Sequence, residues 1–183
     1  MGFPRSSGIL CHPTSFPSAH GIGDLGDSAY DFLDWLHAAG QSLWQVLPLG
    51  PTHPDGCPYQ SFSVHAGSPD LIDLHWLVKH HWLSPAQAQE GMADRWAKRE
   101  ALNLASAAFF QQVDSGVDAP MVRAYHEFLE NADFWLEDYV RFHAFRHSEQ
   151  QRSWSEWPRG LRDRDPLVCD TLAAKLTTEI TRL

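Results

Sequence analysis

The chain has 183 residues, of which 43% are hydrophobic and 20% are charged, fractions typical of a globular domain and not of a disordered or collagen-like chain. Its 14 basic and 23 acidic residues give a net charge of -9, so that the chain, which has no basic block, is a poor candidate for binding nucleic acid or an anionic membrane. No stretch reaches the roughly 18 apolar residues of a membrane-spanning helix, and we expect no secretory signal because residues 1–10 lack a long apolar run.

The three cysteines, Cys11, Cys57 and Cys169, are widely spaced and form no CxxC motif. An odd number of scattered cysteines favours reduced thiols over a disulfide framework. We therefore expect a cytoplasmic protein.

Aromatic residues are abundant, with 8 Trp, 4 Tyr and 10 Phe. Large aromatic side chains dominate the burial in protein cores, so a well-packed core explains them. A surface that stacks sugar rings or bases is the alternative.

The first part of the chain predicts a strand, a helix and a second strand. The short apolar run at 7–10 and the sequence SLWQVL at 42–47 are typical of buried strands. Between them, apolar residues recur at three- and four-residue spacing over 26–39, which predicts a helix whose first turn Asp24 or Asp27 could cap.

This order is a βαβ unit with parallel strands, whose ligands meet the loops at the carboxyl ends of the strands. The loop over 48–66 is long, and loops of such length in a compact unit are usually functional. Tyr59 offers it an aromatic face and a hydroxyl, and Gln60 and Ser61 offer hydrogen-bonding groups, a combination suited to holding a sugar. An ordinary ordered loop, with Tyr59 packed on its own neighbours, is the alternative.

From about residue 71 onward the pattern is mainly helical. The apolar run at 71–79 predicts one turn of strand followed by a short helix, and Ser84-Pro85 predicts a helix start. Helical patterns follow over 94–112, 120–131, 134–146 and 169–183, with an irregular segment at 154–166.

Several chemistries have no support in the sequence. His143 and His147 are spaced to share a helix face, but the HExxH pattern is absent, no third ligand is obvious and Arg141 and Arg146 oppose a cation, so we expect no metal site. The chain also has no GxSxG, Walker or GxGxxG motif. The sequence GIGD at 21–24 predicts a glycine turn before the helix and not a phosphate loop.

Sequence blocks that follow one another in a fixed order resemble a known family. In chain order they are SGIL with HPTS at 7–15, GIGDLG at 21–26, WQVLPLGPT at 44–52, PYQSFS and AG within 58–67, and LIDL at 71–74. Together they resemble the N-terminus of the amylomaltases, the bacterial 4-alpha-glucanotransferases, which have the plant disproportionating enzymes as relatives. Motifs rich in Trp, Arg and Pro within 154–166 resemble the helical insertion of the same family, so the resemblance covers essentially the whole chain.

The resemblance implies an α/β fold, a (β/α)₈ barrel with a mainly helical insertion. Residues 1–75 would start the catalytic barrel with its first two strands and the glucan-site loop 48–66, and 76–183 would form most of the insertion. The implied activity, in maltodextrin or glycogen metabolism, is transfer of 1,4-alpha-glucan segments to the 4-position of glucose or another glucan, without a cofactor.

Retaining transfer of this kind uses two carboxyl groups about 5 Å apart, one as nucleophile and one as acid/base. By the resemblance, the nucleophile Asp and the acid/base Glu belong to later barrel strands, beyond Leu183. We therefore expect a polypeptide of these 183 residues to be an inactive fragment.

The resemblance assigns four substrate-binding candidates in this chain. Tyr59 matches the family tyrosine that packs against a glucose next to the cleavage point. Gln60 and Ser61 belong to the same block and Asp24 to GIGDLG, and for these three an organising role in their loops is the alternative.

The sequence also departs from the family pattern. His53-Pro54 stands where some relatives have a Gly-Tyr pair that serves a second glucan groove, so that groove is not carried over. Cys57 stands where Ser is common, and Ser68 where Asn is common. Two other interpretations stay open: a non-catalytic glucan-binding or interaction module that kept Tyr59, and a nonfunctional truncated product.

Overall fold

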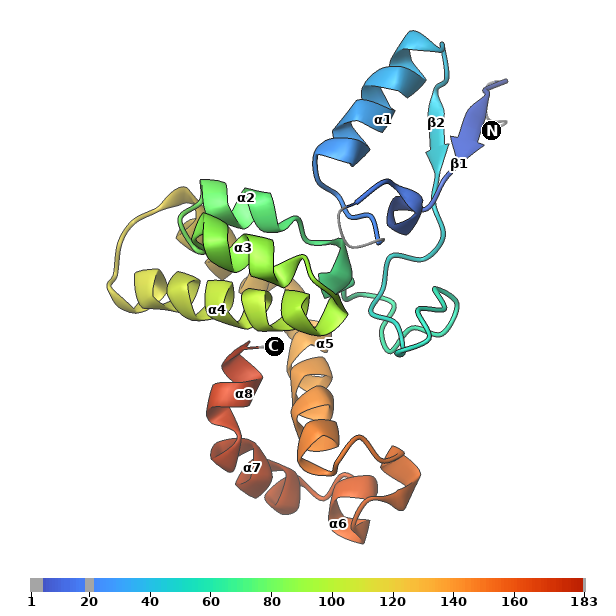
Figure 1. Ribbon diagram of the computed structural model, residues 1–183. Coiled ribbons are helices and arrows are strands. Elements are labelled where there is room, and N and C mark those ends of the chain that lie inside the picture. Colours follow the sequence, from blue (N-terminus) through green and yellow to red (C-terminus); the bar gives the residue numbers. More distant parts are fainter. Residues whose placement is uncertain (1–4, 19–21, 183) are drawn as a thin grey trace. The chain divides into compact units, whose positions relative to one another are not determined.

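The computed structural model describes residues 5–18 and 22–182, which fall into two compact units, Met1–Phe110 and Gln111–Leu183 (Figure 1). Two residues of the predicted segments lie outside the described residues. They are Gly21, the first residue of the block at 21–26, and Leu183, the last residue of the helical pattern at 169–183. These two units are defined by the compactness of the structure. The predicted division at residue 75 is a different boundary, between the barrel and its helical insertion, and it stays a prediction.

The first unit contains the predicted βαβ unit. Strand β1 (Gly8–Leu10) and strand β2 (Leu43–Gln45) pair in parallel, and helix α1 (Asp27–Ala38) connects them, which confirms the predicted order with shorter strands (Figure 1). The strands approach closely at Gly8, where a Cβ atom would lie 2.4 Å from the carbonyl oxygen of Leu43. A larger residue at this position would push the strands apart.

Aromatic and aliphatic side chains form the contact between α1 and the strands. Ala29 and Leu36 of α1 are buried, and the ring of Phe32 lies 5.1 Å from Phe16 and 5.5 Å from Trp44, centroid to centroid. Such spacing is typical of packed aromatic pairs. These aromatic residues therefore belong to a core and not to a sugar-stacking surface.

The predicted cap of α1 is wrong. The helix begins after Gly26, and no side chain caps it. The Oδ1 atom of Asp24 accepts a hydrogen bond from the Gly26 N–H at 3.0 Å, and Asp27 is exposed in the first helical turn. Asp24 therefore organises the turn before the helix, and its second oxygen is left for another partner.

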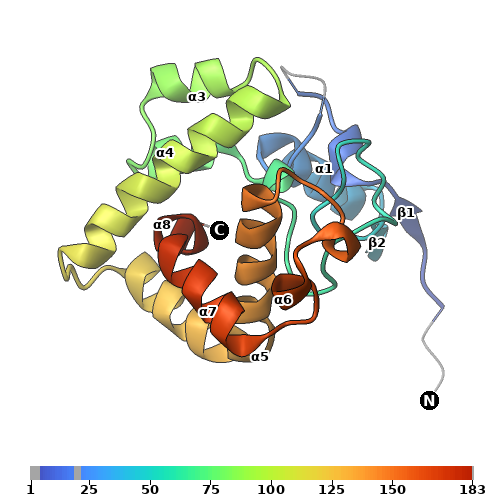
Figure 2. The same ribbon diagram turned by 90° about the horizontal axis from the view of Figure 1, so that it is seen from below.

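One 3₁₀ turn and three α-helices follow the loop after β2. They are the 3₁₀ turn η2 (Pro69–Leu71) and the helices α2 (Leu74–Lys79), α3 (Pro85–Gly91) and α4 (Arg95–Asp114); an earlier 3₁₀ turn, η1 (Pro13–Ser15), follows β1. Asp73 caps α2, and a capping box of Ser84 and Gln87 starts α3, as its Ser-Pro sequence predicts. The chain reverses between α3 and α4 (Figure 2), and α4 continues past the boundary between the units.

The second unit is built on one long helix, α5 (Pro120–Ser148), where the sequence predicted two helices. That prediction is wrong because the segment between them contains no Gly or Pro: Ala132 is buried, and the Asn131 amide donates to the Glu127 carbonyl within the helix. The remaining elements are η3 (Trp154–Glu156), α6 (Arg159–Arg162), α7 (Pro166–Lys175) and α8 (Thr177–Arg182). None of the helices in the described ranges is long and apolar enough to span a membrane.

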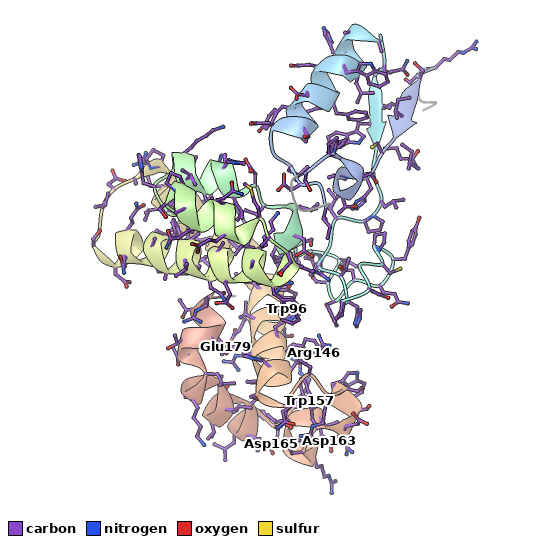
Figure 3. The ribbon with its side chains drawn as sticks, in the orientation of Figure 1. Trp96, Arg146, Trp157, Asp163, Asp165 and Glu179 are labelled. Carbon is purple, nitrogen blue, oxygen red and sulfur yellow. The ribbon has the colours of Figure 1, made fainter. Side chains whose placement is uncertain are left out.

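A small apolar core joins these elements. Phe145 of α5, Trp157 and Leu161 are buried together, and Trp157 is labelled in Figure 3. In the same unit, the exposed Arg164 side chain donates to the carboxylate of Asp138 at 2.5 Å, and this hydrogen bond holds the pKa of Asp138 below its usual value. Exposed ion pairs contribute little to stability, so the apolar core is the main contact within the second unit.

Candidate functional site

The loop after β2 folds on itself through backbone contacts. Thr52 and Ser61 form an antiparallel bridge, and the Phe62 N–H donates to the Pro51 carbonyl at 3.2 Å. Near the tip, Gly56 adopts a positive φ of 72°, which favours glycine. The long loop predicted over 48–66 is therefore an ordered structure with its own hydrogen bonds.

Tyr59 stands near the tip of this loop and is 72% exposed. The alternative in which Tyr59 packs on its own neighbours does not agree with this exposure. Gln60 is exposed as well. An exposed aromatic ring beside an amide can stack on the apolar face of a sugar while the amide binds a hydroxyl.

Ser61 makes contacts inside the loop. Its hydroxyl donates to the Ser63 carbonyl at 2.7 Å and accepts from the Ser63 N–H at 3.3 Å. The same hydroxyl lies against Gly50, where an added Cβ would come within 2.2 Å of it. These contacts give Ser61 a structural role, and a direct contact with a sugar stays a prediction.

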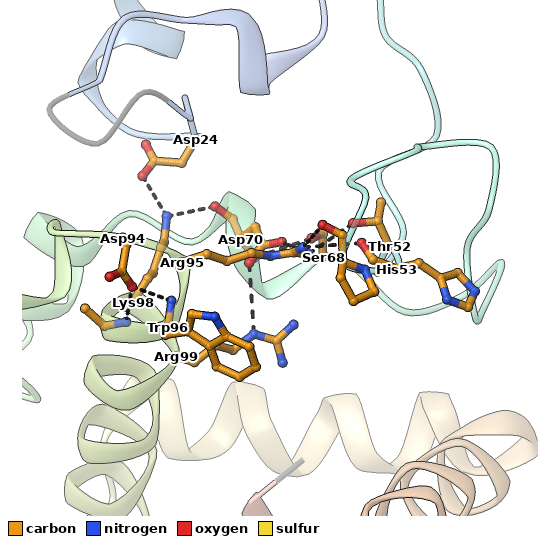
Figure 4. A network of polar contacts seen from close by, with 12 residues as sticks. Asp24, Thr52, His53, Ser68, Asp70, Asp94, Arg95, Trp96, Lys98 and Arg99 are labelled. Atoms are coloured by element: carbon orange, nitrogen blue, oxygen red, sulfur yellow. Dashed lines mark hydrogen bonds and ion pairs between the residues drawn. The ribbon is translucent and has the colours of Figure 1, made fainter. Parts of the chain in front are cut away.

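Asp24 belongs to a buried ion pair away from the tip of the loop. Its Oδ2 atom lies 3.0 Å from the ammonium of Lys98 on α4, whose whole side chain is almost inaccessible, and the same ammonium donates to the Asp70 carbonyl at 2.7 Å (Figure 4). Burial of a charge is costly unless a partner compensates it. Asp24 therefore fixes the segment before α1 against α4, in line with an organising role.

A pocket of about 290 Å³ opens at the carboxyl ends of the two strands. Its wall combines His12 and Thr14 after β1 with Pro48, Leu49 and Gly50 after β2, together with Asp70, Arg95 and others. The His12 ring is held by Thr14, with 2.8 Å between Nδ1 and Oγ1. None of the four predicted site residues is among the described residues that line this pocket. Pro58, the neighbour of Tyr59 in the sequence, does line it.

His12, Asp70 and Arg95 are not among the site residues predicted from the sequence. His12 directly follows the first predicted strand, and ligands bind at the carboxyl ends of parallel strands. Its position could therefore have predicted that His12 lines a binding site. Nothing in the local sequence around Arg95 pointed to the loop, because its partners lie about 40 residues earlier in the chain.

The described residues provide no group of three or more His, Cys, Asp and Glu side chains arranged to hold a metal ion. His147, one of the two histidines considered for this role, has its Nδ1 2.5 Å from a Glu179 oxygen.

Comparison with known proteins places the chain in a family. A family model described as 4-alpha-glucanotransferase matches residues 11–182. The chain belongs to this 4-alpha-glucanotransferase family, as its sequence blocks predicted.

Similar curated proteins agree with the family model. A 4-alpha-glucanotransferase of Thermus thermophilus is 38% identical over 98% of this chain, and one of Synechocystis is 36% identical over 96% of it. The chain spans 36% of the length of each of these two relatives.

A solved structure shares the arrangement of the described chain. The amylomaltase from Streptococcus agalactiae in complex with acarbose matches with a TM-score of 0.85 and 29% sequence identity. The match covers 98% of this chain and 37% of the amylomaltase chain.

Proposed function

We propose that this chain is the part of a 4-alpha-glucanotransferase that begins the catalytic barrel and presents one wall of the glucan site. The observation that carries the proposal is the exposed Tyr59 on an ordered loop after β2, within a chain that matches the family model over residues 11–182. The substrates would be maltodextrins and other 1,4-alpha-glucans. The reaction would transfer a glucan segment to the 4-position of glucose or of another glucan.

In this proposal, β1 and β2 are the first two strands of a (β/α)₈ barrel. Their parallel pairing through α1 and the pocket at their carboxyl ends support it, because barrel enzymes bind substrate at that end. Leu10 and Leu43 are 56% and 55% exposed, as expected of strands whose neighbours in the barrel cover them.

The contribution of this chain to the chemistry would be binding and orientation. Retaining transfer needs two carboxyl groups about 5 Å apart, and we assign both to the part of the enzyme that the chain does not span. Tyr59 would stack on the sugar next to the cleaved bond, holding it in line with those groups. The reaction would need no cofactor. The enzyme would be cytoplasmic.

Substitution of Tyr59 in the natural gene product tests this function. We expect Tyr59→Ala to lower turnover of maltotriose at least tenfold, about the loss of one stacking contact, with little change in the unfolding temperature. Tyr30→Ala is the matched control, because Tyr30 is a similarly exposed tyrosine (66%) on α1.

Equal activity of the two variants would refute the assignment of Tyr59 to the glucan site. Glucan binding by the natural gene product without any transfer of glucose units would instead support the non-catalytic binding module.

A further inference from the structure

The first residue of α4 reaches into the loop that carries Tyr59. The Nη2 atom of Arg95 donates to the Thr52 hydroxyl at 3.1 Å, and its Nη1 atom donates to the carbonyls of His53 and Pro54, each at 3.3 Å (Figure 4). One side chain thus binds three consecutive loop residues. Each of these contacts joins positions more than 40 residues apart in the chain.

The guanidinium is also bound by a carboxylate. The Oδ2 atom of Asp70 on η2 lies 2.5 Å from Nη2, and the side chains of Asp70 and Arg95 are 13% and 26% exposed. The backbone of Asp70 is fixed in turn, since its carbonyl accepts from the buried Lys98 ammonium. A planar guanidinium has five donors and can bind a carboxylate and several loop acceptors together, whereas a lysine ammonium cannot span the same set.

The anchored residues define the frame of the loop. Thr52 is bridged to Ser61, which lies two residues after Tyr59. The Gly56 N–H donates to the His53 carbonyl at 2.9 Å, so the turn at the tip is built on an anchored residue. A mobile Tyr59 would lose conformational freedom on binding a sugar, whereas a fixed frame removes most of this cost before the sugar arrives.

We propose that Arg95 is a positioning residue for the glucan site, acting through the loop frame to hold Tyr59 ready for stacking. This inference rests on the proposed function. Arg95 itself does not need to touch the sugar.

The test uses Arg95→Ala and Arg95→Lys in the natural gene product, with Arg99→Ala as the matched control. Arg99 is on the same helix, one turn further, and its Nε atom lies 4.0 Å from Asp70 Oδ1. We expect Arg95→Ala to lower kcat/KM for maltotriose roughly tenfold, since several hydrogen bonds to a charged group are lost. Arg95→Lys should give a smaller loss, and Arg99→Ala should stay within twofold of the unsubstituted protein.

A double-mutant cycle separates positioning from a general structural effect. If Arg95 acts through Tyr59, Arg95→Ala should have almost no further effect on kcat/KM in a Tyr59→Ala background. The same tenfold loss in both backgrounds would overturn the proposal.

Hydrogen exchange gives a readout that does not depend on catalysis. In Arg95→Ala, the amides of Gly56 and Phe62 should exchange at least tenfold faster, while amides of α1 stay unchanged. Unchanged exchange in the loop would refute the anchoring by Arg95. An unsubstituted protein that transfers no glucose units would refute the proposed function, and the exchange experiment would still decide whether Arg95 anchors the loop.

Discussion

Lys98 joins three segments of the first unit through a single ammonium group. Its side chain is 3% exposed, and its partners are the Asp24 carboxylate from the turn before α1 and the Asp70 carbonyl from η2. When one member of a buried ion pair is removed, the other stays in the interior without compensation. The pair therefore stabilises the fold around the site, and we assign it no part in the chemistry.

We expect Lys98→Met to lower the free energy of unfolding by about 3–5 kcal/mol, because Asp24 loses its counter-charge while it is mostly buried. Lys79→Met is the control: Lys79 lies 3.9 Å from Asp27 and both side chains are exposed, so its loss should be about 0–1 kcal/mol. Urea denaturation followed by tryptophan fluorescence measures both values. Similar losses in the two variants would mean that the buried pair contributes no more than a surface pair.

Single residues could be predicted from the sequence where a local block or position marked them. The sequence predicted Tyr59 in a long loop after a strand, and the structure has it there with its ring exposed. Its role as a binding residue comes from the resemblance of its block to the family and stays a prediction. The ion pair of Asp24 and the loop contacts of Arg95 could not be predicted. Each joins residues 41 or more positions apart, and nothing in the local spacing encodes such a meeting.

At the scale of elements, the loop after β2 depends on one close approach at its base. A Cβ atom added to Gly50 would lie 2.2 Å from the Ser61 hydroxyl oxygen and 2.9 Å from the Ser63 carbonyl oxygen. The second contact is with backbone, which cannot turn aside as a flexible side chain can. Glycine at this position therefore lets the two ends of the loop close on each other.

We expect Gly50→Ala to lower kcat/KM for maltotriose roughly tenfold and stability by about 1–3 kcal/mol, the usual range for overpacking. Gly67→Ala is the control in the same segment, because nothing lies within 4 Å of its added Cβ, and it should change stability by less than about 0.5 kcal/mol. Kinetics and thermal unfolding of both variants provide the measurement. A Gly50→Ala protein with unchanged kinetics would show that the loop tolerates displacement at its base.

Elements with a clear periodicity were predicted well. The apolar spacing of α1 and the two flanking apolar runs gave the parallel βαβ unit, and the Ser-Pro sequence gave the start of α3. The long helix α5 was missed although the segment between the two predicted helices contains no Gly or Pro that would end a helix. The burial of Ala132, which the local pattern does not reveal, shows that tertiary packing also favours one continuous helix.

At the scale of the whole molecule, the described residues contain one parallel pair of strands and eight α-helices. An isolated pair of parallel strands leaves backbone edges and apolar faces without partners. The chain spans 36% of the length of the relatives compared above. We assign none of the residues of this chain to the carboxyl pair that a retaining transferase needs.

We expect a purified polypeptide of these 183 residues to release no glucose from maltotriose and to make no longer maltodextrins. A bound substrate reacts faster through proximity only when a nucleophile and an acid are positioned beside it. In well-oriented cases, this proximity lowers the activation barrier by roughly 7–11 kcal/mol. Chromatography of the maltodextrin products measures this directly, with the natural gene product as the positive control. Disproportionation by the 183-residue polypeptide, lost on Tyr59→Ala, would overturn the placement of the carboxyl pair.

The contact of Arg95 with the loop also limits how this chain can be recombined with a relative. Arg95 lies after residue 75, in the expected insertion, whereas the residues that it binds lie before it, in the expected barrel. A chimaera joined at residue 75 would inherit a loop from one parent and its anchor from another. Exchange of the two parts should therefore succeed when positions 52–54 and 95 come from the same parent.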